Sequence, residues 1–341
     1  MEEVIKIKGG KKLNGTVRIG GSKNATVALI PASILANGPV TICGVPSISD
    51  VESLSVLLQD LGVMVDVRSS DSILIDTENM QNKPLVHDAV NKLRASYYFM
   101  GALLGKYGHV EIRMPGGCYL GPRPIDLHLK GFEALGATVK YDHGCYVLDA
   151  PELVGTKIFL DIASVGATIN IMMAAVHAKG RTTIENAAKE PEIIDVATLL
   201  NKMGAQIRGA GTNVITIDGV DELSGCFHEI IPDRIEAATY IVLVVNSLTS
   251  GLIEKVKIEN IIPHHLESLT SKLTELGVDM KIDIDSITIH GGLDNLHPID
   301  IKTLPYPGFA TDIQQPLTAL LTQAQGQSIV TETIYTERFK H

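Results

Sequence analysis

Cysteine is scarce in this chain, and the spacing of the few cysteines excludes two kinds of site. Four occur among 341 residues, at positions 43, 118, 145 and 226, and none forms a CxxC pair. Disulfide frameworks and structural zinc sites need several cysteines at short spacings. We therefore expect no disulfide scaffold, no metal and no cofactor held by thiolates. Cys43, Cys145 and Cys226, which lie on or beside short β-rich segments, are interpreted as packing residues.

Positive charge is also in deficit. Lysine and arginine number 29 against 39 aspartates and glutamates, a formal net charge of −10, and no basic run is present. This balance argues against a nucleic acid or an anionic membrane as a partner. It does not exclude small anionic substrates, because a few arginines in one cleft reverse the potential locally.

Long apolar runs are missing as well. The longest, residues 240–245, is far shorter than the roughly 20 residues that a membrane span needs. The N-terminus lacks the basic start and apolar stretch of a signal peptide, so a cytoplasmic location is expected. Neither a Walker loop nor a GxGxxG fingerprint occurs, which argues against nucleotide binding by those routes.

A repeat of about 70 residues is the strongest pattern that is present. A leucine or methionine followed by glycine, ahead of a short apolar strand, recurs with the glycines at 62, 136, 204 and 277, spaced 74, 68 and 73 residues apart. A period of this length means that one supersecondary unit is used several times. We predict that a helix ends at each of these glycines.

Each copy contains two helices of different character. The first is apolar almost all round, which predicts burial on every side; these segments start near Asn24, Ala95, Ala167, Ala237 and Thr311. The second is amphipathic, as in residues 50–61, and short β-rich segments lie between them. Helices inside and strands outside predict an inside-out α/β fold. Five copies begin and four finish; the fifth reaches a strand at residues 328–333.

Polar residues occur at the start of every apolar helix: Ser22-Lys23-Asn24, Arg94-Ala95-Ser96, Ser164-Val165-Gly166, Asp233-Arg234-Ile235-Glu236 and Thr311-Asp312. Helix N-termini favour anions because their N–H groups lack helical partners and carry the positive end of the dipole. Lys23 alone is ordinarily a solvated lysine, and Arg94 alone fits a surface ion pair equally well. Their recurrence at one phase of the repeat favours a shared anion site.

Residues 115–124, with the sequence PGGCYLGPRP, form the densest local signal. Three glycines and three prolines in ten residues exclude a helix or a central strand and predict a loop. A lone cysteine is usually a small buried apolar residue. In this loop, five residues before Arg123, Cys118 instead suits a reactive thiol that attacks or donates a proton.

Three further residues have two interpretations each. His128 fits a partly exposed helix residue and a binding residue equally well. Ser164 has no neighbours suited to a nucleophile and is interpreted as a helix cap or a phosphate-contacting hydroxyl. Asp312 is interpreted as an N-terminal cap, with a general base as the compatible alternative.

These motifs, in order along the entire chain, closely resemble the UDP-N-acetylglucosamine 1-carboxyvinyltransferase family. The resemblance also includes Glu185–Ala188, Glu190–Glu192, Pro232–Glu236 and Tyr306–Asp312. It implies a two-domain inside-out α/β barrel of six units with the site between the domains. Residues 1–20 would pack with the second domain, 21–231 would form the first, and 232–341 would form an incomplete second domain.

The resemblance implies the reaction too. Enolpyruvate passes from phosphoenolpyruvate to the 3-hydroxyl of UDP-N-acetylglucosamine, and phosphate is released. This is the first committed step of peptidoglycan synthesis in the bacterial cytoplasm, and fosfomycin blocks it by alkylating the residue matched by Cys118. No cofactor is implied, and the oligomeric state is open.

Roles carry over by motif. Cys118 would protonate the methylene carbon and form a covalent adduct, and Asp312 would act as the base at the sugar hydroxyl. Lys23 and Asn24 would hold phosphoenolpyruvate, and the backbone of Ile334 the amide side of the sugar. The other implied substrate-binding residues are Arg94, Arg123, Pro124, Ile125, Asp126, Leu127, Ala163, Ser164, Val165 and Gly166, with Arg234 and Arg338 as further candidates.

The chain departs from the family in places. Ile162 stands where a basic residue is common, and family members continue for roughly one more unit, about 80 residues by the repeat period. If the 341-residue polypeptide is complete, we therefore expect a frayed second domain and little or no turnover. If a C-terminal part is missing from the sequence, we expect the native protein to be active. Two alternatives stay open: 5-enolpyruvylshikimate-3-phosphate synthase, which lacks the Cys118 loop, and a catalytically silent paralogue or fragment that binds a UDP-sugar.

Overall fold

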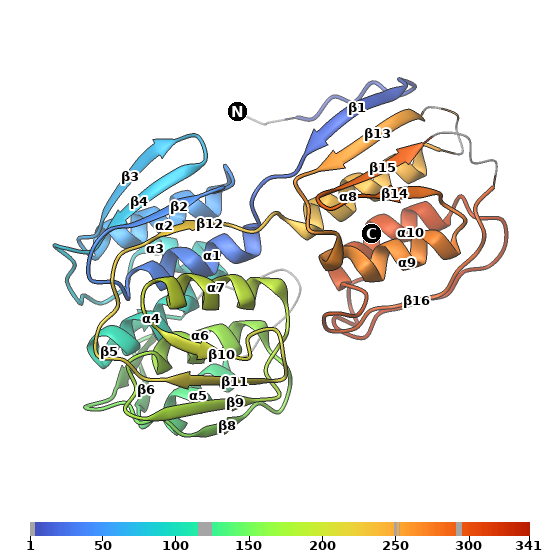
Figure 1. Cartoon of the computed structure of the whole chain (residues 1–341). Coiled ribbons are helices and arrows are strands. Elements are labelled where there is room, and N and C mark those ends of the chain that lie inside the picture. Colours follow the sequence, from blue (N-terminus) through green and yellow to red (C-terminus); the bar gives the residue numbers. More distant parts are fainter. Residues whose placement is uncertain (1–3, 115–124, 249–250, 252, 291–294) are drawn as a thin grey trace. The chain divides into compact units, whose positions relative to one another are not determined.

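The computed structural model describes residues 4–114, 125–248, 251, 253–290 and 295–341 (Figure 1). The chain divides into two compact units. The larger unit is Gly21–Ile231, and the smaller unit combines the residues up to Gly20 with Pro232–His341. Within the described ranges, no helix combines the length and the apolar character that a membrane crossing requires.

The larger unit alternates helices with short strands. Its helices are α1 (Lys23–Ser33), α2 (Ser49–Asp60), α3 (Asp88–Lys92), the 3₁₀ turn η1 (Arg94–Tyr97), α4 (Tyr98–Tyr107), α5 (Asp126–Ala134), α6 (Val165–Ala175) and α7 (Pro191–Lys202). Its strands are β2 (Val40–Cys43), β3 (Met64–Ser69), β4 (Ser72–Asp76), β5 (His109–Arg113), β6 (Thr138–Asp142), β7 (Cys145–Asp149), β8 (Lys157–Phe159), β9 (Arg181–Glu185), β10 (Gln206–Arg208), β11 (Val214–Asp218) and β12 (Phe227–Glu229). They form three sheets, ordered β12-β2-β4-β3, β5-β7-β6 and β10-β11-β9-β8.

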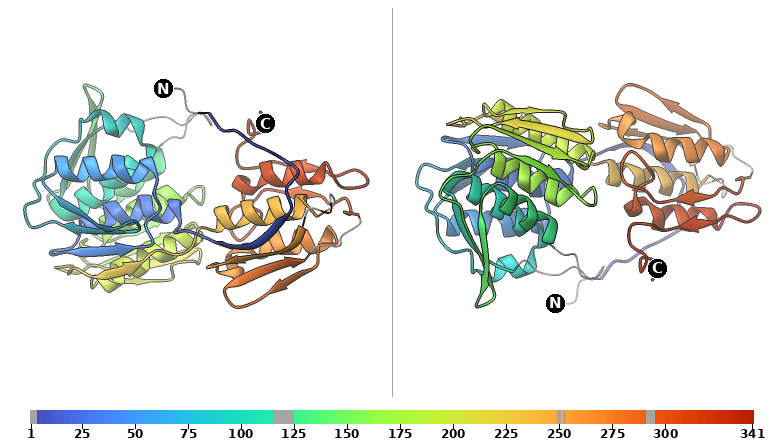
Figure 2. Two further views of the ribbon diagram at one scale, coloured as in Figure 1. Left: turned by 90° about the horizontal axis from the view of Figure 1, so that it is seen from above. Right: turned by 90° about the horizontal axis from the view of Figure 1, so that it is seen from below.

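Three helices fill the middle of the larger unit, as the apolar segments predict. Every residue from Ala25 to Ser33 in α1, from Tyr98 to Gly105 in α4 and from Ala167 to Ala175 in α6 is buried. α4 packs against α1 and α6, and α7 packs against α1 and α6 (Figures 1 and 2). Burial of apolar side chains on all sides of these helices is the main stabilising contribution to this unit.

The smaller unit uses the same elements. Its helices are α8 (Arg234–Asn246), the turn η2 (Pro263–Leu266), α9 (Glu267–Glu275) and α10 (Thr311–Leu321). Its strands are β1 (Leu13–Arg18), β13 (Ile253–Glu259), β14 (Met280–Ile282), β15 (Ser286–His290), β16 (Ile301–Lys302) and β17 (Val330–Thr331). One sheet is ordered β1-β13-β15-β14 and the other pairs β16 with β17, while α8 packs against α10.

The order of elements within a copy explains the 70-residue period. A copy runs helix, strand, amphipathic helix and two antiparallel strands, and in three of the copies a further strand pairs in parallel with the first strand. That parallel strand is β12 beside β2, β8 beside β9, and β1 beside β13. Because β1 pairs with β13, the N-terminal residues lie in the smaller unit rather than beside α1.

The four predicted helix ends are confirmed, and all four use one motif. Gly62, Gly136, Gly204 and Gly277 have φ values of +77°, +102°, +113° and +97°. At the first end, the Gly62 amide donates to the Gln59 carbonyl and the next amide donates to the Leu58 carbonyl. This is the Schellman arrangement, which needs a residue at positive φ and therefore favours glycine.

Three predictions about the helices and strands were wrong in part. The helix expected near Ala95 begins with the 3₁₀ turn η1 and becomes α-helical only at Tyr98. α8 and α10 pack against each other but are not buried all round, since Leu243 of α8 is half exposed. The strand expected over 328–333 is limited to β17.

Candidate functional site

The start of α1 brings Lys23 and Asn24 to carboxylates of two other helices. Ser22 caps the helix, and its Oγ accepts from the Ala25 amide at 3.2 Å. Lys23 Nζ lies 3.0 Å from Asp50 Oδ2 on α2, with more than half of the lysine side chain exposed. Asn24 Nδ2 donates to Glu192 Oε1 on α7 at 3.4 Å. The lysine is thus held in an exposed ion pair and stays accessible to solvent.

The start of α6 lies against the segment that carries Arg94. Ser164 is the N-cap, as predicted, and its Oγ accepts from the Ala167 amide at 3.3 Å. Gly166 follows in the first turn, where an added Cβ would lie 2.9 Å from Tyr97 Oη and 3.1 Å from His128 Cε1. A larger residue at position 166 would have to displace Tyr97 or His128, so the segments that carry Arg94, His128 and Ser164 meet at this helix end.

His128 is fully enclosed, so the interpretation as a partly exposed helix residue was wrong. It is 5% exposed, and its Nδ1 accepts from Asn170 Nδ2 at 2.9 Å. The Tyr97 ring meets the imidazole edge-on at 4.8 Å, and the Arg94 guanidinium lies over that ring at 5.8 Å from its centroid. Burial, together with the nearby Arg94 charge, lowers the pKa of His128 to about 3.

This pKa predicts an acid-sensitive larger unit. In the unfolded chain a histidine binds its proton below about pH 6.5, whereas folded His128 does so only near pH 3. Stability is therefore fully present above pH 6.5 and is lost as the pH falls, by about 2 kcal/mol at pH 5. Urea unfolding at pH 8 and pH 5 should show this loss in the wild type and in His143→Asn, whose side chain is exposed. A His128→Asn variant that kept the full pH dependence would contradict the assignment.

In the smaller unit, Asp312 is paired with Arg338. Asp312 Oδ1 lies 2.6 Å from Arg338 Nη2. The interpretation of Asp312 as an N-cap was wrong, because Ala310 occupies the cap and Thr311 already belongs to α10. Asp312 therefore stands in the first turn, where a carboxylate favours the helix dipole.

The start of α8 carries Arg234. Asp233 is its N-cap and accepts from the amides of Ile235 and Glu236 at 2.8 and 3.0 Å. The Arg234 guanidinium lies over the Tyr306 ring, 5.4 Å from its centroid. Ile334 is exposed, and its amide donates to a buried glutamate, Glu332, at 2.8 Å.

The remaining predicted residues fall into two groups. Cys118, Arg123 and Pro124 lie outside the described residues. The predicted residues that follow Pro124 or stand at the start of α6 are exposed or partly buried: Ile125, Asp126, Leu127, Ala163 and Val165. Cys43, Cys145 and Cys226 lie on or next to β2, β7 and β12, as expected for packing residues.

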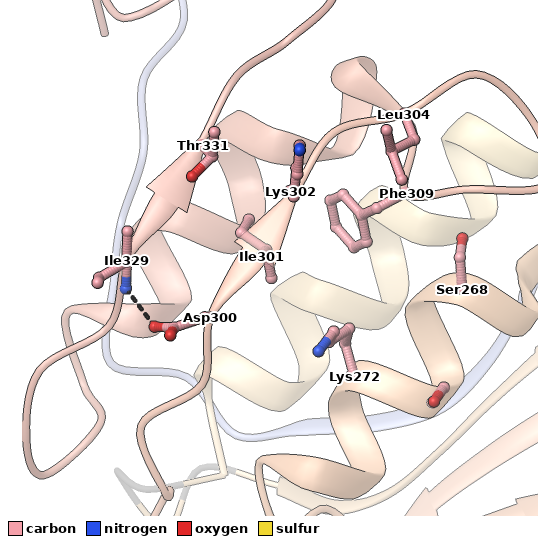
Figure 3. A pocket seen from close by; sticks show the side chains of 10 residues that line it. Ser268, Lys272, Asp300, Ile301, Lys302, Leu304, Phe309, Ile329 and Thr331 are labelled. Carbon is pink, nitrogen blue, oxygen red and sulfur yellow. Dashed lines mark hydrogen bonds between the residues drawn. The ribbon is translucent and has the colours of Figure 1, made fainter.

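A cavity of about 460 Å³ in the smaller unit contains none of the predicted residues. It lies between α9 and the β16–β17 pair and is lined in part by Lys272, Lys302 and Phe309 (Figure 3). Asp300 at its edge accepts from the Ile329 amide at 2.8 Å. Since the polar residues singled out by the repeat lie elsewhere, we do not assign the site to this cavity.

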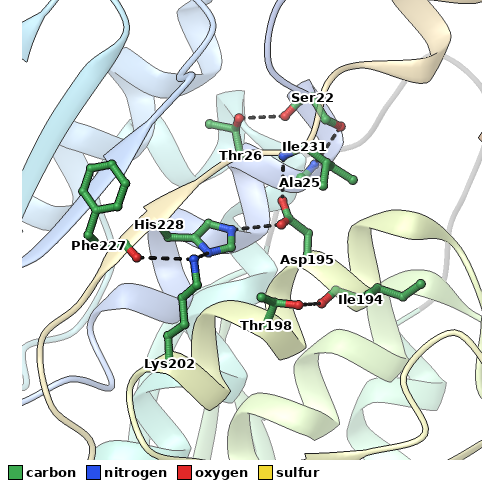
Figure 4. A network of polar contacts seen from close by, with 10 residues as sticks. All are labelled: Ser22, Ala25, Thr26, Ile194, Asp195, Thr198, Lys202, Phe227, His228 and Ile231. Atoms are coloured by element: carbon green, nitrogen blue, oxygen red, sulfur yellow. Dashed lines mark hydrogen bonds and ion pairs between the residues drawn. The ribbon is translucent and has the colours of Figure 1, made fainter. Parts of the chain in front are cut away.

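A buried polar network on α7 and β12 contacts the start of α1 through Ile231 (Figure 4). His228 Nε2 on β12 lies 2.9 Å from Asp195 Oδ1 on α7, and both side chains are at most 3% exposed. Asp195 Oδ2 accepts from the Ile231 amide at 3.3 Å, and the Ile231 carbonyl accepts from the Ser22 amide at 2.8 Å. Lys202 Nζ approaches His228 Nδ1 at 3.4 Å.

Several residues that complete these clusters were not predicted from the sequence, namely Asp50, Tyr97, Asn170, Asp195, His228 and Glu332. Tyr97 was detectable, since it follows Arg94 within the first turn of the same segment. The others have side-chain partners that lie 21 to 42 residues away along the chain, and no local pattern marks them.

Comparisons with known proteins agree on one family. A family model described as EPSP synthase (3-phosphoshikimate 1-carboxyvinyltransferase) matches residues 7–341. The chain is 59% identical over 341 residues to UDP-N-acetylglucosamine 1-carboxyvinyltransferase 2 of Bacillus anthracis, covering 100% of this chain and 78% of that protein. The protein of the same name from Bacillus subtilis is 58% identical over 339 residues, covering 99% and 78%.

Solved structures show the same fold at lower identity. The enolpyruvyl transferase NikO from Streptomyces tendae superimposes with a TM-score of 0.86 at 24% identity, covering 97% of this chain and 78% of that one. An EPSP synthase from Acinetobacter baumannii gives a TM-score of 0.72 at 19% identity, covering 94% and 74%. The predicted α/β fold of the enolpyruvyl transferases is confirmed.

Proposed function

The chain belongs to the UDP-N-acetylglucosamine 1-carboxyvinyltransferases within the EPSP synthase family, and we propose that it transfers enolpyruvate from phosphoenolpyruvate to the 3-hydroxyl of UDP-N-acetylglucosamine. The observation that carries the proposal is 59% identity maintained over all 341 residues. The order of repeated helix starts, with Lys23, Arg94 and Ser164 at one phase, supports it.

The reaction needs an acid and a base acting on different atoms. The sugar oxygen bonds to C2 of phosphoenolpyruvate while its proton leaves and the C3 methylene gains a proton. The tetrahedral adduct then loses phosphate from C2 and a proton from C3, which restores the double bond and gives the enol ether. We assign the proton transfer at C3 to Cys118 and that at the hydroxyl to Asp312.

The larger unit supplies cations and helix N-termini for the anionic groups. Lys23 and Asn24 stand at the exposed start of α1, and Arg94 lies near His128 beside the start of α6. Because its pKa is lowered, His128 stays neutral at neutral pH and adds no second positive charge beside Arg94. Such preorganised dipoles and charges stabilise phosphate and carboxylate where charge develops.

A phosphate-release assay tests the function. Phosphate is expected only when phosphoenolpyruvate and UDP-N-acetylglucosamine are both present. Release with shikimate 3-phosphate instead would establish the 5-enolpyruvylshikimate-3-phosphate synthase alternative. Tight UDP-sugar binding without phosphate release would establish the silent paralogue or fragment.

Replacing Lys23 should weaken phosphoenolpyruvate binding. A charge-assisted hydrogen bond to a substrate anion contributes about 1.5–3 kcal/mol, so Lys23→Ala should raise the KM for phosphoenolpyruvate about 10- to 100-fold. Lys157→Ala is the matched control, because Lys157 also forms an exposed ion pair, with Glu185 at 2.8 Å. If Lys23→Ala and Lys157→Ala had equal KM values for phosphoenolpyruvate, Lys23 would not be a phosphoenolpyruvate-binding residue.

A further inference from the structure

Glu332 is a buried carboxylate that four hydrogen-bond donors surround. It follows β17 and is 8% exposed. Its Oε1 accepts from Thr303 Oγ1 at 2.7 Å, from the Ile334 amide at 2.8 Å and from the Tyr335 amide at 3.1 Å. Its Oε2 accepts from Thr311 Oγ1 at 2.8 Å. One side chain thus joins the residue that follows β16, the start of α10 and the segment after β17.

The surroundings of Glu332 keep it charged. Burial opposes ionisation, but the hydrogen bonds from Thr303, Tyr335, Ile334 and Thr311 outweigh it, so the pKa of Glu332 lies below its ordinary value. A buried anion with fixed donors has one preferred arrangement. It therefore constrains the position of every group that donates to it.

Thr311 passes this constraint to Asp312. Its Oγ1 donates to Glu332 and accepts from Arg338 Nη1 at 3.2 Å. Arg338 Nη2 in turn contacts Asp312 Oδ1, and the guanidinium lies over the Tyr335 ring at 5.7 Å. The Arg338 side chain is 16% exposed, so it is fixed between these partners rather than extended into solvent.

We propose that Glu332 is a positioning residue for the transfer reaction: through Thr311 and Arg338 it orients the Asp312 carboxylate, and directly it fixes the Ile334 amide. The inference rests on the proposed function, since Asp312 and Ile334 matter only if they meet the sugar. It assigns Arg338 a role in orienting the base instead of binding substrate. The two effects can be tested separately, because Oε2 of Glu332 accepts from Thr311 on the Asp312 side and Oε1 accepts from the Ile334 amide.

The Thr311→Val variant tests the Asp312 arm. It keeps the side-chain shape and removes the hydroxyl that joins Glu332 to Arg338. We expect kcat for phosphate release to fall about 10- to 100-fold, the usual cost of misplacing a reacting group by about 1 Å. The KM for UDP-N-acetylglucosamine should change less than about threefold, because the Ile334 amide keeps its partner.

Thr318→Val is the matched control on the same helix. The Thr318 hydroxyl donates a hydrogen bond of 2.8 Å to the Gln314 carbonyl within α10. Because this bond does not reach Glu332 or Arg338, its loss should leave kcat and KM unchanged. Glu332→Gln should lower kcat like Thr311→Val, because the amide oxygen replaces Oε1 and its NH₂ group then faces Thr311. Urea unfolding of all three variants measures their stability, so that a fall in kcat caused by partial unfolding can be told from a fall caused by misplacement of Asp312.

The outcomes are distinct. A selective kcat loss in Thr311→Val and Glu332→Gln, with Thr318→Val unchanged, supports the inference. If the wild type is active and Thr311→Val has the same kcat as Thr318→Val, the inference is overturned while the proposed function stands. The same holds if Thr311→Val raises KM and leaves kcat unchanged. A wild type that neither binds UDP-N-acetylglucosamine nor releases phosphate overturns the proposed function, and the inference with it.

Discussion

Asp195→Ala is expected to lower the free energy of unfolding of the larger unit by about 3–5 kcal/mol, the cost of leaving half of a buried pair unpartnered. Asp195 and His228 are 3% and 2% exposed, so water does not replace the lost carboxylate. The Ile231 amide loses its acceptor as well. Each unmet buried polar group adds its desolvation penalty.

Urea unfolding followed by far-ultraviolet circular dichroism measures this loss, and hydrogen exchange on peptides from α7 and β12 assigns it to the larger unit. Asp161→Ala is the control, since Asp161 pairs with Lys130 on the surface and should cost less than about 1 kcal/mol. Asp195→Leu combined with His228→Leu should recover most of the stability, because apolar packing replaces both partners. An Asp195→Ala loss no larger than that of the control would contradict this account.

The same variant should affect the site. Asp195 holds the Ile231 amide, and the Ile231 carbonyl holds the amide of Ser22, the cap of α1. Faster exchange of the Ser22 and Ile231 amides is therefore expected together with the stability loss. The buried network thereby connects core stability to the segment that presents Lys23.

The helix ends and most strands were predictable because their signals are local. A glycine after leucine or methionine, followed by an apolar residue, contains nearly all the information that a Schellman end needs, and all four were confirmed. The alternation in segments such as Val256–Ile258 and Ile287–Ile289 likewise marks β13 and β15. The buried helices of the larger unit followed from residues that are apolar on every side.

What failed depended on contacts between distant segments. The His128 sequence environment is amphipathic, and only the approach of Tyr97 and Asn170 encloses it. Parts of α8 and α10 are as apolar as α6. Whether such a helix is buried on all sides depends on the elements that pack around it, and the sequence of the helix does not contain that information. Glu332 lies within the strand expected over 328–333, and the sequence alone marks it as an ordinary polar residue, because its partners Thr303 and Thr311 are distant in the chain.

Asp312→Asn is expected to lower kcat for phosphate release by about 10²- to 10⁴-fold, the usual contribution of a positioned base. The carboxylate is held by Arg338 through Oδ1 and is 42% exposed, so it is both oriented and accessible. Asparagine retains an oxygen for Arg338 but does not accept the hydroxyl proton. UDP-N-acetylglucosamine binding, measured by calorimetry, should change less than about threefold, since the loss is confined to the chemical step.

Asp300→Asn is the matched control for this loss. Asp300 also accepts a hydrogen bond in the smaller unit, from the Ile329 amide, and an asparagine oxygen replaces that acceptor. Its kcat should equal that of the wild type. If Asp312→Asn kept more than about a third of the wild-type kcat, another group would take the proton. The Arg338 pair would then be structural, because an ion pair that orients a base has no catalytic effect once the base is dispensable.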